Sequence, residues 1–153
     1  MIALRLVRLI ESHSDELAQG LITKLENSAR TKDLKKVAPE ELRSRVYEIF
    51  HHLSEWLLTR PEVDIESRYT MIGARRASQG VSLADFSWAL VMTKEYLWDF
   101  LQRQGFLQSP IELYGEMELL RLLDQFFDHA LCYASEGFEQ YAMHSDRQME
   151  ARA

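Results

Sequence analysis

The chain has 153 residues, a length that suits one domain able to bury roughly 70% of the surface of its unfolded chain. Hydrophobic residues make up 46% and charged residues 27%, which is ordinary for a folded globular protein, and the net charge of −6 without a long basic tract argues against nucleic-acid binding. A single cysteine, Cys132, excludes an internal disulfide framework and is typical of a reducing cytoplasm.

Apolar residues at helical spacing predict a first helix over about residues 2–29. Ser12 and Ser14 compete for backbone hydrogen bonds, so we expect a kink or a second helix start between them. Charges interrupt the apolar stretch and no cleavage site follows it, so the segment fits neither a signal peptide nor a membrane span. We expect the apolar residues 1–4 to need a partner, such as a second copy of the chain.

Residues 31–38 are predicted to form a connector, and Pro39, followed by two glutamates, predicts the start of the second helix. Arg60-Pro61 should end that helix, because proline cannot continue it. Asp64 is expected to cap the third helix, which should end at Gly80, because glycine readily adopts the left-handed conformation found at helix ends.

The third helix carries an arginine on its apolar face. Ile65, Tyr69 and Ile72 form a stripe at helical spacing, and Arg76 falls at its centre. Gly73, at the edge of the stripe, leaves a flat spot for a close neighbour. We expect Arg76 to cap the last carbonyl groups of its helix; the alternative is an inward guanidinium paired with a carboxylate, because a buried unpaired charge is very costly. The candidate carboxylates are Asp85, Glu95, Asp99 and Asp128.

Ser82 and Asp85, just after Gly80, have the spacing of a capping box, in which both side chains accept hydrogen bonds from free N–H groups of the first helical turn. The helix that follows is apolar on nearly every side, which is typical of a buried helix. We therefore expect it to be the central helix, ending at Gly105.

A second capping box over residues 109–112 predicts the start of the last helix, which would be about 60 Å long if continuous to residue 153. Small residues at the middle of its apolar arc would let another helix approach closely, and residues 143–153 should form a frayed or projecting tail. The arc consists of Leu119, Leu122, Leu123, Phe126, Phe127, Ala130, Ala134, Gly137 and Tyr141.

The sequence shows neither strand alternation nor repeats. It therefore predicts an all-α protein, with residues 1–153 as a single helical bundle of about five helices and a long C-terminal helix.

The sequence carries no recognisable catalytic or metal-binding signature. His51 and His52 are adjacent and cannot face one site together, and neither HExxH nor CxxCH occurs. His129, at the edge of the last apolar arc, is expected to be a structural or surface histidine rather than a haem ligand. Five aromatic residues could line a cofactor pocket, although aromatics at helical spacing usually belong to the core; they are Trp56, Trp88, Tyr96, Trp98 and Phe127. We expect no enzymatic activity, no metal and no bound cofactor.

Several short motifs resemble those of one family. The central pattern is Gly73-x-x-Arg76-x-x-Gln79-Gly80-x-Ser82-Leu83, followed by Ala89-Leu90 and Leu97-Trp98. Upstream stand Pro39-x-Glu41-Leu42-Arg43, Leu53 and Trp56-Leu57, and downstream stand Phe126-Phe127-Asp128 and Gly137-Phe138-Glu139. With these motifs the chain resembles the N-terminal sensor domain of RsbR-type stressosome co-antagonists, a globin-like helical domain that lacks haem.

This resemblance implies a regulatory input module, usually dimeric, coupled through its last helix to an output domain. The phosphorylatable sulfate-transporter/anti-sigma-antagonist domain of that family does not follow within these residues, which leaves open a stand-alone sensor-like protein or a piece of a longer one.

Two classes of function stay open. The first is a non-enzymatic signalling domain in the cytoplasm that acts through homodimerisation and a protein partner in a signalling assembly, without nucleic-acid or membrane partners. The second is a sensor or carrier that binds haem or an apolar molecule between helices. We favour the first, and an absorption spectrum together with native mass spectrometry would separate the two.

Overall fold

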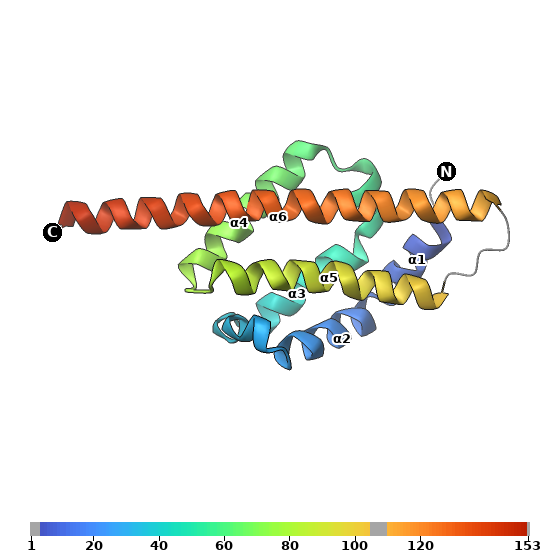
Figure 1. Cartoon of the computed structure of the whole chain (residues 1–153), viewed down its shortest axis with the longest axis horizontal. Coiled ribbons are helices and arrows are strands. Elements are labelled where there is room, and N and C mark those ends of the chain that lie inside the picture. Colours follow the sequence, from blue (N-terminus) through green and yellow to red (C-terminus); the bar gives the residue numbers. More distant parts are fainter. Residues whose placement is uncertain (1–3, 105–109, 153) are drawn as a thin grey trace.

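The computed structural model describes residues 4–104 and 110–152, which form helices and turns with no strand among them, confirming the all-α class (Figure 1). Over this part of the chain the predicted five helices are six α-helices and two shorter helical segments. In chain order they are α1 (Leu4–Ser12), α2 (Ser14–Glu26), the 3-10 segment η1 (Ala29–Lys36), α3 (Pro39–His51), the π-helical turn η2 (Glu55–Thr59), α4 (Glu62–Ser78), α5 (Leu83–Gln104) and α6 (Pro110–Arg152). The expectations for Met1, Ile2, Ala3, Gly105 and Ser109 lie outside the described residues.

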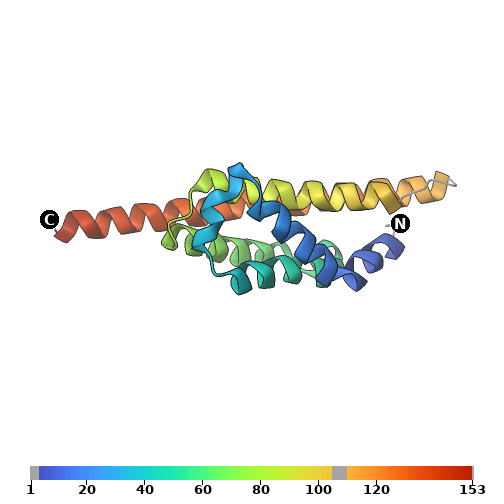
Figure 2. The same cartoon turned by 90° about the horizontal axis from the view of Figure 1, so that it is seen from below.

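The first predicted helix is two helices that meet at His13. The backbone of His13 has φ −108° and ψ 20°, which leaves helical geometry. The hydroxyl of Ser12 donates to the carbonyl oxygen of Leu9 at 3.0 Å, the kind of competing hydrogen bond expected from a serine at a helix end. A second helix start at Ser14 is therefore the correct alternative, and the chain changes direction between α1 and α2 (Figure 2).

Three other boundaries differ from the predictions. Residues 31–38, predicted as a connector, mostly belong to the 3-10 segment η1. The second helix begins at Pro39 as predicted, but α3 breaks at His52, where φ is −111° and ψ is 27°, before helical structure resumes and ends at Arg60. Asp64 does not cap α4, because Pro61 occupies the N-cap position and Asp64 lies inside the first turn. Its backbone N–H donates to the carbonyl oxygen of Pro61 at 3.0 Å.

The most extensive contact between helices joins α4 to α6, which cross in Figure 1. A Cβ atom added at Gly73 of α4 would lie 1.9 Å from the carbonyl oxygen of Ala134, and one added at Gly137 of α6 would lie 2.0 Å from that of Thr70. The two backbones therefore touch, and a side chain at either glycine would overlap the opposite main chain. The predicted close approach at the small residues of the last helix is confirmed, as is the flat spot at Gly73.

The expectation that α5 is a central helix buried on all sides is wrong. Trp88 is 39% exposed, and the guanidinium of Arg30 covers its ring at 3.9 Å from the ring centroid. The guanidinium comes from η1, so this ring is partly covered by a cation–π contact and not by apolar packing. The buried residues of α5 lie along one side of the helix and are Phe86, Leu90, Met92, Thr93, Leu97 and Leu101. The helix that spans the length of the molecule is α6 (Figures 1 and 2).

Helix α6 has 43 residues and is roughly 64 Å long at the usual rise per residue. Its C-terminal end extends beyond the other helices in both views, so the predicted tail is a projecting helix (Figures 1 and 2). The residues of the apolar arc of α6 are buried or half-buried as far as Gly137. Tyr141, which the sequence placed in the apolar arc, is 40% exposed, and most described residues after Gly137 are exposed as well.

We predict that Gly73→Ala lowers the free energy of unfolding by about 2 kcal/mol, because its methyl group would push two backbones apart. The control is Gly20→Ala within α2, where the added Cβ would lie 2.1 Å from the Tyr96 hydroxyl oxygen, the movable end of a side chain. The higher helix propensity of alanine offsets part of that cost. Urea unfolding of both variants measures the difference, and equal losses would show that the backbone contact imposes no special constraint.

Candidate functional site

Residues 4–104 and 110–152 contain no group of three His, Cys, Asp or Glu side chains placed to hold a metal ion. The histidines of interest are separate: His51 is exposed, His52 Nδ1 lies 3.4 Å from a Glu55 oxygen, and His129 Nδ1 lies 2.5 Å from Glu62 Oε1. The absence of catalysis, of a metal and of a haem stays a prediction.

Arg76 forms a buried ionic cluster that connects α4 to α3. Its side chain is 3% exposed and donates to Gln79 Oε1 at 2.9 Å and to Glu41 Oε2 at 3.3 Å. Gln79 Nε2 also donates to Glu41 Oε2, at 2.7 Å, and Arg75 Nε donates to the other carboxylate oxygen. The prediction that Arg76 caps helix carbonyls is wrong, and so are all four carboxylates considered as its partners.

The cluster keeps Glu41 ionised. Burial raises the pKa of Glu41, but the hydrogen bonds from Gln79 and Arg75 and the positive charge of Arg76 outweigh burial and hold this pKa below its usual value. Burial lowers the pKa of Arg76, and the charge of Glu41 opposes that change. Sequence spacing could not show that α3 lies against α4. The available signal was that Glu41 and Arg76 both belong to the motifs carrying the family resemblance.

The turn between α4 and α5 is held by a pair of aspartates. Gly80 has φ 78°, and the Ser82 hydroxyl accepts from the Asp85 N–H at 3.1 Å, as predicted for a cap. The prediction that the Asp85 side chain caps its own helix is wrong, because Asp85 Oδ2 accepts from the backbone N–H of Asp33 at 2.8 Å. Asp33 Oδ2 in turn accepts from the N–H of Ser82 at 2.9 Å. This exchange fastens η1 to the start of α5.

Lys36 of η1 makes a third contact with the turn between α4 and α5. Lys36 Nζ donates to the carbonyl oxygen of Gly80 at 3.0 Å and lies 3.7 Å from Asp33. The hydrogen bond from the N–H of Ser82 lowers the pKa of Asp33; partial burial opposes it and the charge of Lys36 adds to it.

A polar clasp joins the first turn of α4 to α6. The hydroxyl of Tyr133 donates to Glu62 Oε1 at 2.7 Å, and His129 Nδ1 contacts the same oxygen. The bond from Tyr133 lowers the pKa of Glu62, and the hydrogen bond to this carboxylate raises the pKa of Tyr133 to about 12. Together with the contact at Gly73 and Gly137, the clasp makes the α4–α6 contact the candidate functional element.

The five aromatic residues proposed for a cofactor pocket do not meet in one place. Trp56 and Phe127 belong to the core, where both contact Phe126, with ring centroids 5.8 and 5.1 Å away. Tyr96 and Trp98 are partly buried on α5. Trp98 Nε1 donates to Asp124 on α6 at 3.1 Å. Trp88, on the same helix, lies under the guanidinium of Arg30, so these residues do not define a shared pocket.

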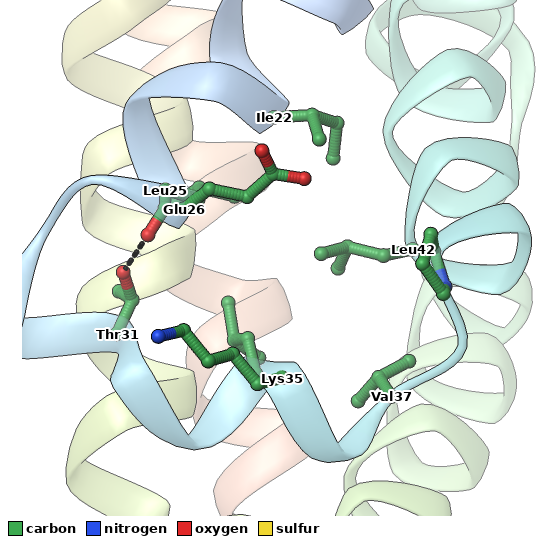
Figure 3. Close-up of a pocket in the computed structure, with 9 residues that line it drawn as sticks. Ile22, Leu25, Glu26, Thr31, Lys35, Val37 and Leu42 are labelled. Atoms are coloured by element: carbon green, nitrogen blue, oxygen red, sulfur yellow. Dashed lines mark hydrogen bonds between the residues drawn. The ribbon is translucent and has the colours of Figure 1, made fainter.

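A cavity of about 330 Å³ lies elsewhere, between α2, η1 and α3 (Figure 3). Most of its lining is apolar, and Glu26 and Lys35 contribute the charged groups. Thr31 braces one side by donating to the carbonyl oxygen of Leu25 at 2.7 Å. The apolar lining consists of Ile22, Leu25, Leu34, Val37, Pro39 and Leu42. Its volume is at the small end of the range for ligand pockets.

Comparison with known proteins identifies the family. The model described as the RsbT co-antagonist protein rsbRD N-terminal domain matches residues 13–153. The chain belongs to this family, which confirms the resemblance read from the motifs around Gly73 and Arg76 and supports a regulatory domain related to the stressosome. Neither the curated proteins nor the solved structures contain a match, so a globin-like arrangement stays a prediction.

No helix within residues 4–104 and 110–152 combines the length and the hydropathy that crossing a bilayer requires.

We predict that Glu41→Gln lowers the free energy of unfolding at neutral pH by about 2–3 kcal/mol, because it leaves the buried Arg76 without a counter-charge. Glu40→Gln, on the exposed side of the same helical turn, is the control and should change it by less than about 0.5 kcal/mol. Equal effects in urea unfolding would contradict a stabilising role for the cluster.

The pH dependence provides a second readout. The pKa of Glu41 is lower in the folded protein than its ordinary value of 4.5, so its stabilisation is complete above that value and is lost as pH falls through the folded pKa. The stability difference between the parent and Glu41→Gln should therefore shrink as acid is added.

Proposed function

We propose that the protein is a non-enzymatic input domain of a signalling assembly, and that α6 carries its output through protein–protein contact. The observation that carries this proposal is that one continuous helix is fixed to the body by backbone contact at Gly73 and Gly137 and then projects beyond it. The family relationship supports the regulatory role.

The geometry supplies a physical basis for transmission. A change in the position of α4 would act on α6 through main-chain atoms, without flexible side chains between them. Because α6 is one helix from Pro110 to Arg152, a displacement at Ala134 would move the projecting end as well. A variant that changes the contact between α4 and α6 tests this coupling.

We further propose a homodimer built on α1 and the first turns of α6, in a cytoplasmic protein. Tyr114 is 70% exposed and Met117 55% exposed on α6, with Leu113 beside them at 38%, while Leu4 of α1 is 39% exposed. Apolar side chains exposed to this extent at one end of a molecule are typical of a surface that a partner covers. A protein partner would then engage the projecting end, where Met143 is 55% exposed and Met149 69% exposed.

The second candidate function is binding of a small apolar molecule. It is favoured by the cavity in Figure 3, whose lining is largely aliphatic. A bound molecule would appear in native mass spectra as added mass, and a haem would absorb light strongly. The signalling proposal requires neither.

We predict that Ala134→Leu and deletion of residues 144–153 both abolish capture of specific partners from lysate, the first by displacing α6 and the second by removing the contact surface. The single change Met149→Ala should weaken capture, whereas Met71→Ala should not, because Met71 is an exposed methionine on α4 outside the projecting end. Light scattering after size exclusion should give a dimer mass for the deletion variant. If every variant folds, dimerises and retains all specific partners, α6 is not the output element.

A further inference from the structure

A second cavity, of about 270 Å³, opens between α3, η2 and α4, and its lining is mainly polar. Nothing in the family description assigns it a role. Its lining residues are Ser44, Arg45, Tyr47, Glu48, His52, Trp56, Arg60 and Arg68.

Three of these residues carry buried N–H donors with unmet hydrogen-bonding capacity. Arg45 Nε, Arg68 Nε and Trp56 Nε1 are shielded from solvent and have no hydrogen-bond partner among residues 4–104 and 110–152. The Trp56 side chain is 5% exposed. Buried donors are nearly always paired, because an unpaired one forfeits its bond to water without replacing it. All three donors belong to side chains that line this one cavity, so a small rotation of those side chains would present them to an acceptor from outside the chain.

The inner part of the cavity has an excess of positive charge. Glu48 binds the terminal nitrogens of both arginines, with Arg45 Nη1 at 3.6 Å from Oε2 and Arg68 Nη2 hydrogen-bonded to Oε1. One carboxylate therefore faces two guanidinium groups, and the three side chains are only 26% to 29% exposed. In both Arg45 and Arg68 the ion pair with Glu48 uses a terminal guanidinium nitrogen, and the Nε–H group has no acceptor.

At the rim of the cavity, positive and negative side chains balance one another more closely than in the inner group. Arg60 lies 3.3 Å from Glu55 and 3.8 Å from Asp64, and its guanidinium covers the Trp56 ring at 5.0 Å. His52 also contacts Glu55. These rim side chains, Trp56 excepted, are more than 40% exposed, so solvent screens their charges more than those of the inner group.

We propose that this cavity binds a small molecule through an oxyanion, a carboxylate or a phosphate, and that the side chains of Arg45, Arg68 and Trp56 turn to donate their N–H groups to it. Guanidinium groups are well suited to oxyanions, and an indole N–H is a donor only. The polar lining disfavours an apolar ligand, and the excess positive charge disfavours a cation. The site is separate from the projecting end of α6, so its occupancy is testable without the proposed signalling function.

If both proposals hold, the site is placed to act as the input. Trp56 contacts Phe126 of α6, and Arg68 lies on α4 close to Thr70, the residue whose carbonyl oxygen meets Gly137. An oxyanion at Trp56 would therefore bind beside both helices of the α4–α6 contact.

The experiment uses the full chain with Trp88→Phe and Trp98→Phe, which leaves Trp56 as its one tryptophan. Its fluorescence and its indole N–H resonance are followed while inorganic phosphate and, separately, acetate replace chloride at constant ionic strength. At least one probe should shift both signals saturably. Arg45→Lys and Arg68→Lys keep the positive charge but lack the Nε–H, so each should weaken binding about tenfold.

Arg75→Lys is the matched control, because Arg75 pairs with Glu41 outside the cavity, and it should leave the affinity unchanged. Saturation by phosphate alone or by acetate alone would support the site and identify the oxyanion. Absence of saturation with both probes would show a cavity filled only by water and overturn the proposal. Equal weakening by all three lysine variants would also overturn it, since that indicates a general charge effect. Deletion of residues 144–153 should leave binding intact even if the signalling proposal fails.

Discussion

The structure depends on one steric constraint, the contact between the backbones of α4 and α6. At Gly73 and Gly137 the distance to the opposite carbonyl oxygen leaves no room for a methyl group. This contact fixes the point at which α6 crosses α4. The crossing point in turn decides which residues of α6 are covered by the body and which extend past it. Glycine destabilises an isolated helix relative to alanine, so its presence at both positions is explained by the packing it permits.

Ionic and hydrogen-bonded groups join other elements around this pair of helices. Arg76 connects α4 to Glu41 of α3, while Asp33 and Asp85 connect η1 to the start of α5. Burial makes the first group a strong constraint, because a guanidinium that is 3% exposed cannot lose its carboxylate without leaving a buried charge unpaired. Backbone contact thus fixes α4 against α6, and electrostatic pairing links α3 to α4 and η1 to α5.

Features encoded locally in the sequence were predictable. The start of α3 at Pro39, the positive φ at Gly80 and the cap at Ser82 depend on residues close together in the chain. The glycine and alanine positions on α6 also predicted close approach, because a small residue in an apolar arc has few other uses.

Features that depend on which elements meet were not predictable. The partner of Arg76 is 35 positions earlier in the chain, and the partner of Asp85 is 52 positions earlier. Trp88 of α5 meets Arg30 of η1, which is distant from it in the chain. The polar cavity was missed for the same reason, because its lining comes from α3, η2 and α4 and its residues have no common spacing.

Hydrogen exchange of backbone amides tests the central constraint most directly. If the contact couples the two helices, amides near Gly73 and those near Ala134 should have the same high protection and lose it together in Gly73→Ala, while amides beyond Met143 exchange fast in both proteins. If the amides near Ala134 exchange independently of those near Gly73, or as fast as those of the projecting end, α6 is not held by this contact and the account is contradicted.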